Sequence, residues 1–273
     1  MKQRPGKCKN VMILGGDGYI GTNLIKYLKN ENDISIWSYD IIRGSRGEEF
    51  TTVLGYDCIV LLAAFPGVIN CRGNIKKAVI DNISVAFNIM NQAAIDNVPV
   101  IFTSSQAAKE PFDNFYATIK KIIEIEAFRL NELGADNRIL RLTNVYGGAN
   151  YLEKKNTVVK QFIMARRNDI KLVINGDGNQ IRDFIHVDDV CKAIHLCILY
   201  NNKIKEPIDI GTGIGISIRN LAELFNNEFT FVNDSDTIGA LESVADISKA
   251  KELLDFTATE SLLYYIEENN LQQ

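Results

Sequence analysis

The sequence lacks the patterns that mark a metal centre or a disulfide framework. It contains only two histidines, and its five cysteines are scattered along the chain with no Cys-x-x-Cys pair. Structural zinc sites and disulfide-rich folds both need closely spaced ligands or paired cysteines. We therefore expect no metal site, and reduced, mostly buried thiols at Cys8, Cys58, Cys71, Cys191 and Cys197.

Long hydrophobic runs and an excess of positive charge are absent as well. No stretch approaches the ~20 apolar residues of a membrane-spanning helix, and the N-terminus has no apolar signal-peptide core. The formal net charge is −4, which argues against general binding to nucleic acid or to a membrane surface. We expect a cytoplasmic protein, in which a few local charges would suffice to bind an anionic ligand.

What the chain does contain is an alternation of apolar strands and helices. Its 273 residues, of which 46% are apolar, suffice for one large α/β domain or a core with a small appended lobe. Nearly continuous apolar strands that alternate with helices predict a doubly wound parallel sheet covered on both faces. Strands are expected at residues 11–14, 34–39, 58–64, 99–103, 138–143 and 207–210, and helices at residues 22–28, 75–97, 116–133, 157–168 and 187–200.

The rhythm of strands and helices also predicts the domain organisation. Residues 1–8 are polar and basic and are expected to form a loose tail, followed by a core over residues 9–150. Beyond that point the alternation loosens. Residues 151–273 are expected to form mainly a small α/β substrate lobe, with some elements returning to the core sheet. On the long helix, Val79, Ile83, Phe87, Met90 and Ala94 are the expected buried face.

A glycine-rich turn joins the first strand to the first helix. Gly15, Gly18 and Gly21 follow the apolar strand Val11–Leu14, with Tyr19 and Ile20 between the last two glycines. Backbone N–H groups of a first helical turn, and the positive end of the helix dipole, point at a phosphate in such a unit. We expect Gly15 to permit the tight turn, Gly18 the approach of a pyrophosphate, and Gly21 close helix–strand contact. The five residues of this turn are therefore candidates for binding a dinucleotide cofactor.

Asp40 is the candidate ribose-binding residue. It ends the second strand, 19 residues past Gly21, where a carboxylate can accept hydrogen bonds from both ribose hydroxyls of an adenosine. The same carboxylate would repel a 2′-phosphate, which favours NAD over NADP. Arg43 and Arg46 lie close in sequence and would weaken that preference, so NADP is not excluded.

Tyr116 and Lys120 place a phenol and an ammonium group on one face of a predicted helix. This helix follows a strand that ends in Ser104 and Ser105. Lys120 and an oxidised nicotinamide would both lower the pKa of Tyr116, which could then accept a proton from a substrate hydroxyl. Ser105 would hold that hydroxyl or relay its proton. The pair Tyr151 and Lys155 has the same spacing, but it lies in a polar connection and is expected on the surface.

Several motifs in order along the chain resemble the NAD-dependent epimerase/dehydratase family, a group of extended short-chain dehydrogenases/reductases that act on nucleotide sugars. The most specific of them is the segment 176–189. The resemblance implies that Ser105, Tyr116 and Lys120 are catalytic. The further matching motifs are Gly15-x-x-Gly18-x-x-Gly21, Asp57-Cys-Ile-Val-Leu-Leu-Ala-Ala64, Ser104-Ser105, Tyr116-x-x-x-Lys120 and Arg141-Leu-Thr-Asn-Val-Tyr-Gly147.

The resemblance also assigns binding residues. It implies that Ala63 and Ala64 line the cofactor and that Lys120 contacts it. It further implies that Asn144 and Arg182 bind a nucleotide-diphosphate sugar, and a guanidinium such as that of Arg182 suits phosphate recognition. Members often form homodimers through two helices per subunit, here the helices expected at residues 75–97 and 116–133.

Departures from the family pattern narrow the expected reaction. Dehydratases of the family carry Asp-Glu directly after the catalytic threonine, whereas this chain has Gln106-Ala107, so elimination of water is set aside. A nucleotide-sugar epimerase, acting at C4 through a transient ketone, is the first hypothesis, with polysaccharide biosynthesis as the expected context. The alternatives are a 4-ketosugar reductase or sugar dehydrogenase using the same residues, and a non-catalytic dinucleotide sensor, which the retained Tyr116 and Lys120 disfavour.

Overall fold

The computed structural model describes residues 9–40, 51–154, 157–225, 228–232 and 240–271. The expected tail at residues 1–8, together with Arg43, Arg46 and Lys155, lies outside the described residues. Contacts divide the chain into two compact units. The first contains Met1–Arg141 and Cys191–Ile208, and the second contains Leu142–Val190 and Asp209–Gln273. The sequence placed its boundary at residue 150; the compact units divide after Arg141, and the segment 191–208 belongs to the first unit.

The largest sheet is six-stranded with the order β2-β1-β3-β4-β5-β9, and its first five strands, apart from Leu142, lie in the first unit. The registered pairs of β1 with β2, β1 with β3, and β3 with β4 are all parallel. The strand order reverses between β1 and β3, and crevices at such points bind ligands in doubly wound sheets. The strands are β1 (Lys9–Leu14), β2 (Ile34–Tyr39), β3 (Cys58–Leu61), β4 (Val100–Ser105), β5 (Asn137–Leu142) and β9 (Ile208–Ile210).

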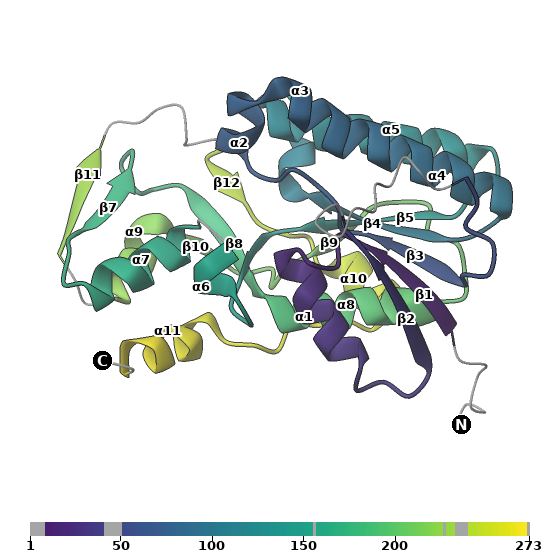
Figure 1. The fold of residues 1–273 in the computed structure, drawn as a ribbon. Helices are drawn as coiled ribbons and strands as arrows, with labels where there is room; N and C mark the ends of the chain where they lie inside the picture. The colour runs from purple at the N-terminus through teal and green to yellow at the C-terminus, as the bar shows by residue number, and fades with distance from the viewer. Residues whose placement is uncertain (1–8, 41–50, 155–156, 226–227, 233–239, 272–273) are drawn as a thin grey trace. The chain divides into compact units, whose positions relative to one another are not determined.

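Helices cover both faces of this sheet, as the fold class predicted. Figure 1 shows α2 to α5 on one face, and α1 with α8 on the other. Their apolar side chains pack on strands that are almost fully buried, such as Val11 to Leu14. The helices are α1 (Tyr19–Leu28), α2 (Val68–Gly73), α3 (Ile75–Ala78), α4 (Val85–Asp96), α5 (Phe115–Glu132) and α8 (Val187–Leu199).

The long helix expected at residues 75–97 contains a π-helical turn, Val79–Ser84, between α3 and α4. This turn adds a residue per turn and rotates the buried face, so the predicted face is only partly correct. Val79 is 36% exposed, whereas Asn82 is buried. The Asn82 amide accepts a hydrogen bond from Phe65 N–H at 3.0 Å and donates to the carbonyl oxygens of Phe65 and Ala78. A polar group thus occupies the inward position of the turn.

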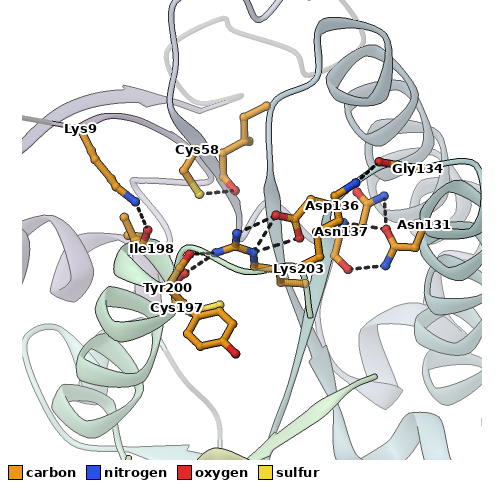
Figure 2. A network of polar contacts seen from close by, with 12 residues as sticks. Lys9, Cys58, Asn131, Gly134, Asp136, Asn137, Cys197, Ile198, Tyr200 and Lys203 are labelled. Atoms are coloured by element: carbon orange, nitrogen blue, oxygen red, sulfur yellow. Dashed lines mark hydrogen bonds and ion pairs between the residues drawn. The ribbon is translucent and has the colours of Figure 1, made fainter. Parts of the chain in front are cut away.

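Cations bind the carbonyl groups at the C-terminal end of α8. Arg138 on β5 donates to the carbonyl oxygens of Cys197 at 2.6 Å and Tyr200 at 2.8 Å, and it pairs with Asp136. Lys9 donates to the carbonyl oxygen of Ile198 at 2.7 Å, as Figure 2 shows. These contacts satisfy carbonyls that have no partner within the helix and complement the negative end of its dipole.

The second unit contains shorter elements. In it β8 pairs antiparallel with β10 and parallel with both β6 and β12, while β7 pairs with β11. Tyr151 on α6 is 1% exposed and hydrogen-bonds Thr157, so its predicted surface position is wrong. It packs edge-on against Tyr265, a contact from α11 that local sequence does not indicate. The elements are β6 (Asn144–Tyr146), α6 (Tyr151–Lys154), α7 (Val158–Arg167), β7 (Leu172–Asn175), β8 (Ile181–His186), β10 (Gly215–Ser217), α9 (Ile218–Glu223), β11 (Phe229–Val232), β12 (Glu242–Ser243), α10 (Ser248–Leu254) and α11 (Leu262–Leu271).

Candidate active site

The structure brings Ser105, Tyr116 and Lys120 together in the first unit. Ser105 is the last residue of β4, and its Oγ accepts a hydrogen bond from Ala107 N–H at 3.3 Å, which caps the short 3-10 helix Gln106–Lys109. Tyr116 is the second residue of α5, and it hydrogen-bonds the Ser105 side chain. Asn114 begins α5 because its side chain accepts from Ala117 N–H at 2.9 Å.

Lys120 lies one turn further along α5, on the same face. It is 4% exposed, and its Nζ donates to the carbonyl oxygen of Thr103 at 2.9 Å. The ammonium group lies 5.9 Å from the ring centroid of Tyr116 and 4.7 Å from that of Phe102. The phenol and the cation are therefore neighbours, as the spacing predicted, and both are fixed to the end of β4.

The protein's own groups hold the Tyr116 phenol in its neutral form. Burial raises the pKa of Tyr116 to about 12, while the Ser105 hydrogen bond acts in the opposite direction. Cys71 Sγ, which donates to the Phe65 carbonyl at 3.2 Å, also raises the Tyr116 pKa. Lys120 is not among the groups that shift this pKa, so the expected lowering by Lys120 together with an oxidised nicotinamide stays a prediction. A positive charge on a bound cofactor would act to lower the Tyr116 pKa.

The glycine turn has the shape that a pyrophosphate site requires. Gly15 has φ +88°, and a Cβ there would lie 2.5 Å from the backbone nitrogen of Ala63. A Cβ on Gly21 would lie 2.2 Å from the Gly15 carbonyl oxygen, so α1 packs directly on the turn. Gly18 begins α1 without a side-chain cap, and the first turn of α1 carries no acidic residue. Backbone N–H groups at the start of such a helix fit the diphosphate of a dinucleotide.

Asp40 lies beside this turn, as expected for a ribose-binding carboxylate. One of its carboxylate oxygens accepts a hydrogen bond from Asp17 N–H at 3.1 Å. Ala63 lies across from Gly15, at the end of β3, where its N–H donates to the Leu14 carbonyl at 2.8 Å. The glycine turn, the Asp40 carboxylate and the residues that follow β3 therefore lie together where the strand order reverses. This arrangement fits NAD.

The two predicted sugar-nucleotide residues both belong to the second unit. Asn144 begins β6, and its side-chain amide donates to the Asp183 carbonyl at 3.0 Å. Arg182 lies on β8 and donates to the Ile181 carbonyl at 2.8 Å. Asn144 and Arg182 therefore lie on neighbouring strands, β6 and β8, and both contact the backbone of β8.

Sequence reasoning missed Asp183, which organises this part of the second unit. Its carboxylate is completely buried and accepts hydrogen bonds from Thr212 N–H at 3.0 Å, Thr212 Oγ1 at 2.7 Å and Gly213 N–H at 2.9 Å. A further N–H, that of Ala245, donates at 3.2 Å. Its place in the specific segment 176–189 was the only available signal, because its partners lie about 30 and 60 residues further along the chain.

Sequence reasoning also missed a buried ion pair beside Ser105. Glu124 on α5 is completely buried, and both of its carboxylate oxygens accept from Arg141 at the end of β5, at 2.8 and 2.6 Å. Glu124 follows Tyr116 and Lys120 at helical spacing, and that series of polar residues on one face was the overlooked signal.

Within the described ranges, no three His, Cys, Asp or Glu side chains group closely enough to bind a metal ion. No helix in the same part of the chain combines the length and apolar character needed to cross a membrane. Four of the five cysteines, at positions 58, 71, 191 and 197, are buried free thiols, as predicted.

Known proteins resemble this chain over most of its length. It is 26% identical to a UDP-glucuronate 4-epimerase of Thermodesulfobacterium geofontis, over 84% of this chain and 76% of the relative. It is 25% identical to the GDP-L-fucose synthase of Escherichia coli, over 79% of each chain. The crystal structure of UDP-glucuronic acid 4-epimerase from Bacillus cereus, in complex with UDP-glucuronic acid and NAD, has the same fold, with a TM-score of 0.84 at 21% identity. That comparison covers 96% of this chain and 98% of the other.

The family comparison agrees with the motifs and with the fold. The model of the NAD dependent epimerase/dehydratase family matches residues 11–211, a range that begins in β1 and ends just after β9. This range contains the glycine turn, the Ser105, Tyr116 and Lys120 group, and Arg182. The chain therefore belongs to the NAD dependent epimerase/dehydratase family.

Proposed function

We propose that this protein is an NAD-dependent nucleotide-sugar epimerase that acts at C4 of the sugar. The observation that supports it most is the arrangement of Ser105, Tyr116 and Lys120 at the end of β4, in the same unit as the glycine turn. Relatives named as 4-epimerases match most of the chain, which favours this reaction among those of the family.

In the proposed reaction Tyr116 accepts the proton of the sugar's C4 hydroxyl. When bound, NAD supplies the hydride acceptor and afterwards the hydride donor, so it is not consumed. Ser105 holds the phenol through its hydrogen bond, and Lys120 supplies a positive charge below the ring. Once the ketosugar has turned over, Tyr116 returns the proton to the new C4 alkoxide.

Substrate binding is assigned to two residues of the second unit. We propose that Arg182 binds the phosphates of a nucleotide-diphosphate sugar through its guanidinium group, and that Asn144 contacts the same ligand. Both side chains hydrogen-bond backbone carbonyls of β8, at Ile181 and Asp183, so a common strand supports them.

A reductase that uses the same residues is the second candidate. The similarity to a GDP-L-fucose synthase over 79% of the chain favours it. In that case a single hydride step would consume a nicotinamide cofactor in proportion to product.

A substrate panel separates the two candidates. The purified protein is incubated with UDP-, dTDP-, GDP- and CDP-sugars, with and without added NAD(P)H, and products are resolved by chromatography and NMR. Epimerisation without stoichiometric cofactor consumption is expected. Strict consumption of NAD(P)H per product would instead establish the reductase.

Tyr116→Phe is the control for the chemistry. This variant lacks only the phenol oxygen, so NAD binding should persist while turnover falls by roughly 10²–10⁴-fold, the usual contribution of a positioned base. Wild-type turnover by the variant would remove Tyr116 from the mechanism.

We further propose that the protein forms a homodimer through α4 and α5. Both helices expose apolar side chains, among them Ile95 at 77%, Ile125 at 57% and Leu133 at 74%. A hollow of about 420 Å³ lies at the C-terminal ends of the two helices and includes Ile95 and Leu133 in its lining. Apolar exposure on two adjacent helices is typical of a surface that a second copy covers.

A further inference from the structure

A buried polar network connects both chain neighbours of Ser105 to a single arginine. Ser104, which precedes it, is 3% exposed and donates its hydroxyl to Glu124 at 2.7 Å. Glu124 in turn accepts two hydrogen bonds from Arg141. Gln106, which follows Ser105, is 6% exposed and donates its amide to the backbone carbonyl of Arg141 at 3.4 Å. Arg141 is therefore linked to Ser104 indirectly, through Glu124, and contacts Gln106 directly through its backbone carbonyl.

The direction of the hydrogen bonds at Ser105 gives this network a chemical meaning. The Oγ of Ser105 accepts from Ala107 N–H, so its own proton is directed to another acceptor. The hydrogen bond with Tyr116 lowers the Tyr116 pKa, which is the effect of a donor that stabilises the phenolate. Since burial raises that pKa to about 12, the Ser105 bond is the protein's own contribution toward an active base.

We propose that Glu124 and Arg141 are a positioning pair for Ser105, which keeps the serine hydroxyl directed at the phenol oxygen of Tyr116. The proposal rests on the proposed function, because only a reaction that uses the phenolate benefits from this donor. Neither residue of the pair is itself assigned a contact with substrate or cofactor.

A purely stabilising role is the competing explanation. Buried ion pairs are poor stabilisers, because desolvation of both charges offsets most of their attraction, and apolar replacements of similar size often fold as well. Besides the two hydrogen bonds within the pair, Glu124 accepts from the Ser104 hydroxyl and the backbone carbonyl of Arg141 accepts from Gln106. Contacts to both chain neighbours of one serine are better explained by a positioning role than by stabilisation alone. The two explanations predict different results for the ionisation of Tyr116.

The test compares two variants that loosen the network with one matched control. Ser104→Ala removes a single hydrogen bond, and the double variant Glu124→Leu/Arg141→Met removes the charged pair without leaving a lone buried charge. The control is the double variant Asp136→Leu/Arg138→Met, which removes the ion pair between Arg138 of β5 and the preceding Asp136, whose charged groups lie 2.6 Å apart. Folding of each protein is checked by circular dichroism and thermal melting.

The first readout is the pKa of Tyr116 itself. It is obtained with saturating NAD from the ultraviolet difference between each protein and the same protein carrying Tyr116→Phe. Weakening the hydrogen bond from Ser105 should raise the Tyr116 pKa by about one unit, which reduces the phenolate fraction at neutral pH about tenfold. The control pair should leave the Tyr116 pKa at the wild-type value.

The second readout asks whether the effect passes through Ser105. In a Ser105→Ala background, Ser104→Ala should cause no further change in the Tyr116 pKa, since the donor is already gone. A shift of the same size in both backgrounds would overturn the proposal. So would well-folded network variants with a wild-type Tyr116 pKa. If the double variant does not fold, Ser104→Ala decides alone.

The titration needs no sugar substrate, so it separates this proposal from the proposed function. Where a sugar nucleotide of the panel turns over, kcat should fall about tenfold in the network variants with KM unchanged, because binding does not depend on the phenolate. A panel without turnover would reject the epimerase while leaving the positioning role decided by the titration.

Discussion

At the scale of single residues, Gly21 is the position of the cofactor turn where a Cβ would approach backbone atoms most closely. A Cβ there would lie 2.2 Å from the Gly15 carbonyl oxygen and 2.7 Å from the Gly16 Cα, so backbone would have to move. We expect Gly21→Ala to cost about 1–3 kcal/mol of unfolding free energy, as overpacking does, and to weaken NAD binding. Urea unfolding and calorimetric titration with NAD measure the two effects.

Gly73→Ala is the matched control for this substitution. A Cβ at Gly73 meets no heavy atom within 4 Å, and the residue lies in helix α2. Alanine should be neutral or slightly stabilising there, with unchanged NAD affinity. Equal losses of stability and NAD affinity in the two variants would show that close packing at Gly21 is not their cause.

The lowered pKa of His195 makes the free energy of unfolding depend on pH near neutrality. Burial against Tyr27 lowers the pKa of His195 below its ordinary 6.5, although Glu31 and Asp33 act in the opposite direction. In the unfolded chain the imidazole binds its proton more readily, so the folded state loses stability as the pH falls below about 6.5. Above that pH the contribution is complete.

Urea unfolding of wild type and His195→Gln at several pH values tests this expectation. The wild type should lose more unfolding free energy than the variant between about pH 7 and pH 5, where histidine titrates. Parallel pH curves for the two proteins would exclude His195 as the source. With only two histidines in the chain, the imidazole resonance of His195 can also be followed directly by NMR.

At the scale of elements, the C-terminal end of α8 depends on one arginine. Arg138 supplies two of the cationic contacts to its carbonyl groups and is also the partner of the partly buried Asp136. Arg138→Met should cost about 3–5 kcal/mol of unfolding free energy, because it leaves the Asp136 carboxylate without its cation. Lys9→Met removes the single, partly buried hydrogen bond to the Ile198 carbonyl at the same helix end. It should cost about 1 kcal/mol or less of unfolding free energy.

Denaturant unfolding of three proteins measures these contributions. Asp136→Leu/Arg138→Met should recover much of the loss seen in Arg138→Met, since no lone charge remains buried. If the single and double variants are equally destabilised, the carbonyl contacts of α8, and not the ion pair, carry the stability.

The elements differ in how far the sequence could predict them. Apolar runs and turn residues gave β2 with its observed ends, and the helix α5 to within a residue at either end. The local pattern predicted a partly wrong buried face for the helix of residues 75–96. Its π-helical turn brings Asn82 into contact with Phe65, which lies 17 residues away in the sequence. The local pattern also failed at Tyr151, because the aromatic partner, Tyr265, lies in the last helix.

At the scale of the whole molecule, the assembly can be tested through the exposed apolar side chains of α5. Ile125→Asp places a charge on the face proposed to meet a second copy, so we expect the wild type to sediment as a dimer and this variant as a monomer. Ile170→Asp is the control, because Ile170 is 59% exposed but lies outside α4 and α5. A wild-type protein that sediments as a monomer, or a dimer that survives Ile125→Asp, would contradict the proposed interface.

Residues distant in sequence account for most of what the motifs did not show. The motifs named Ser105, Tyr116, Lys120 and the glycine turn, because short spacings carry that chemistry. They could not show that the Asp183 carboxylate accepts hydrogen bonds from the turn at Thr212, or that Glu124 on α5 pairs with Arg141 on β5. Such contacts join elements whose approach depends on the completed fold, so no local pattern encodes them.

The four buried thiols offer a way to watch the molecule open. Cys71 lies near the phenol of Tyr116, whereas Cys58 and Cys197 lie where β3 and α8 approach Arg138. A thiol reagent can modify each of them only while it is transiently exposed, so each modification rate reports how often its region of the structure opens. If NAD slows the modification of Cys71 more than that of Cys58 and Cys197, the region around Tyr116 opens less often when the cofactor is bound.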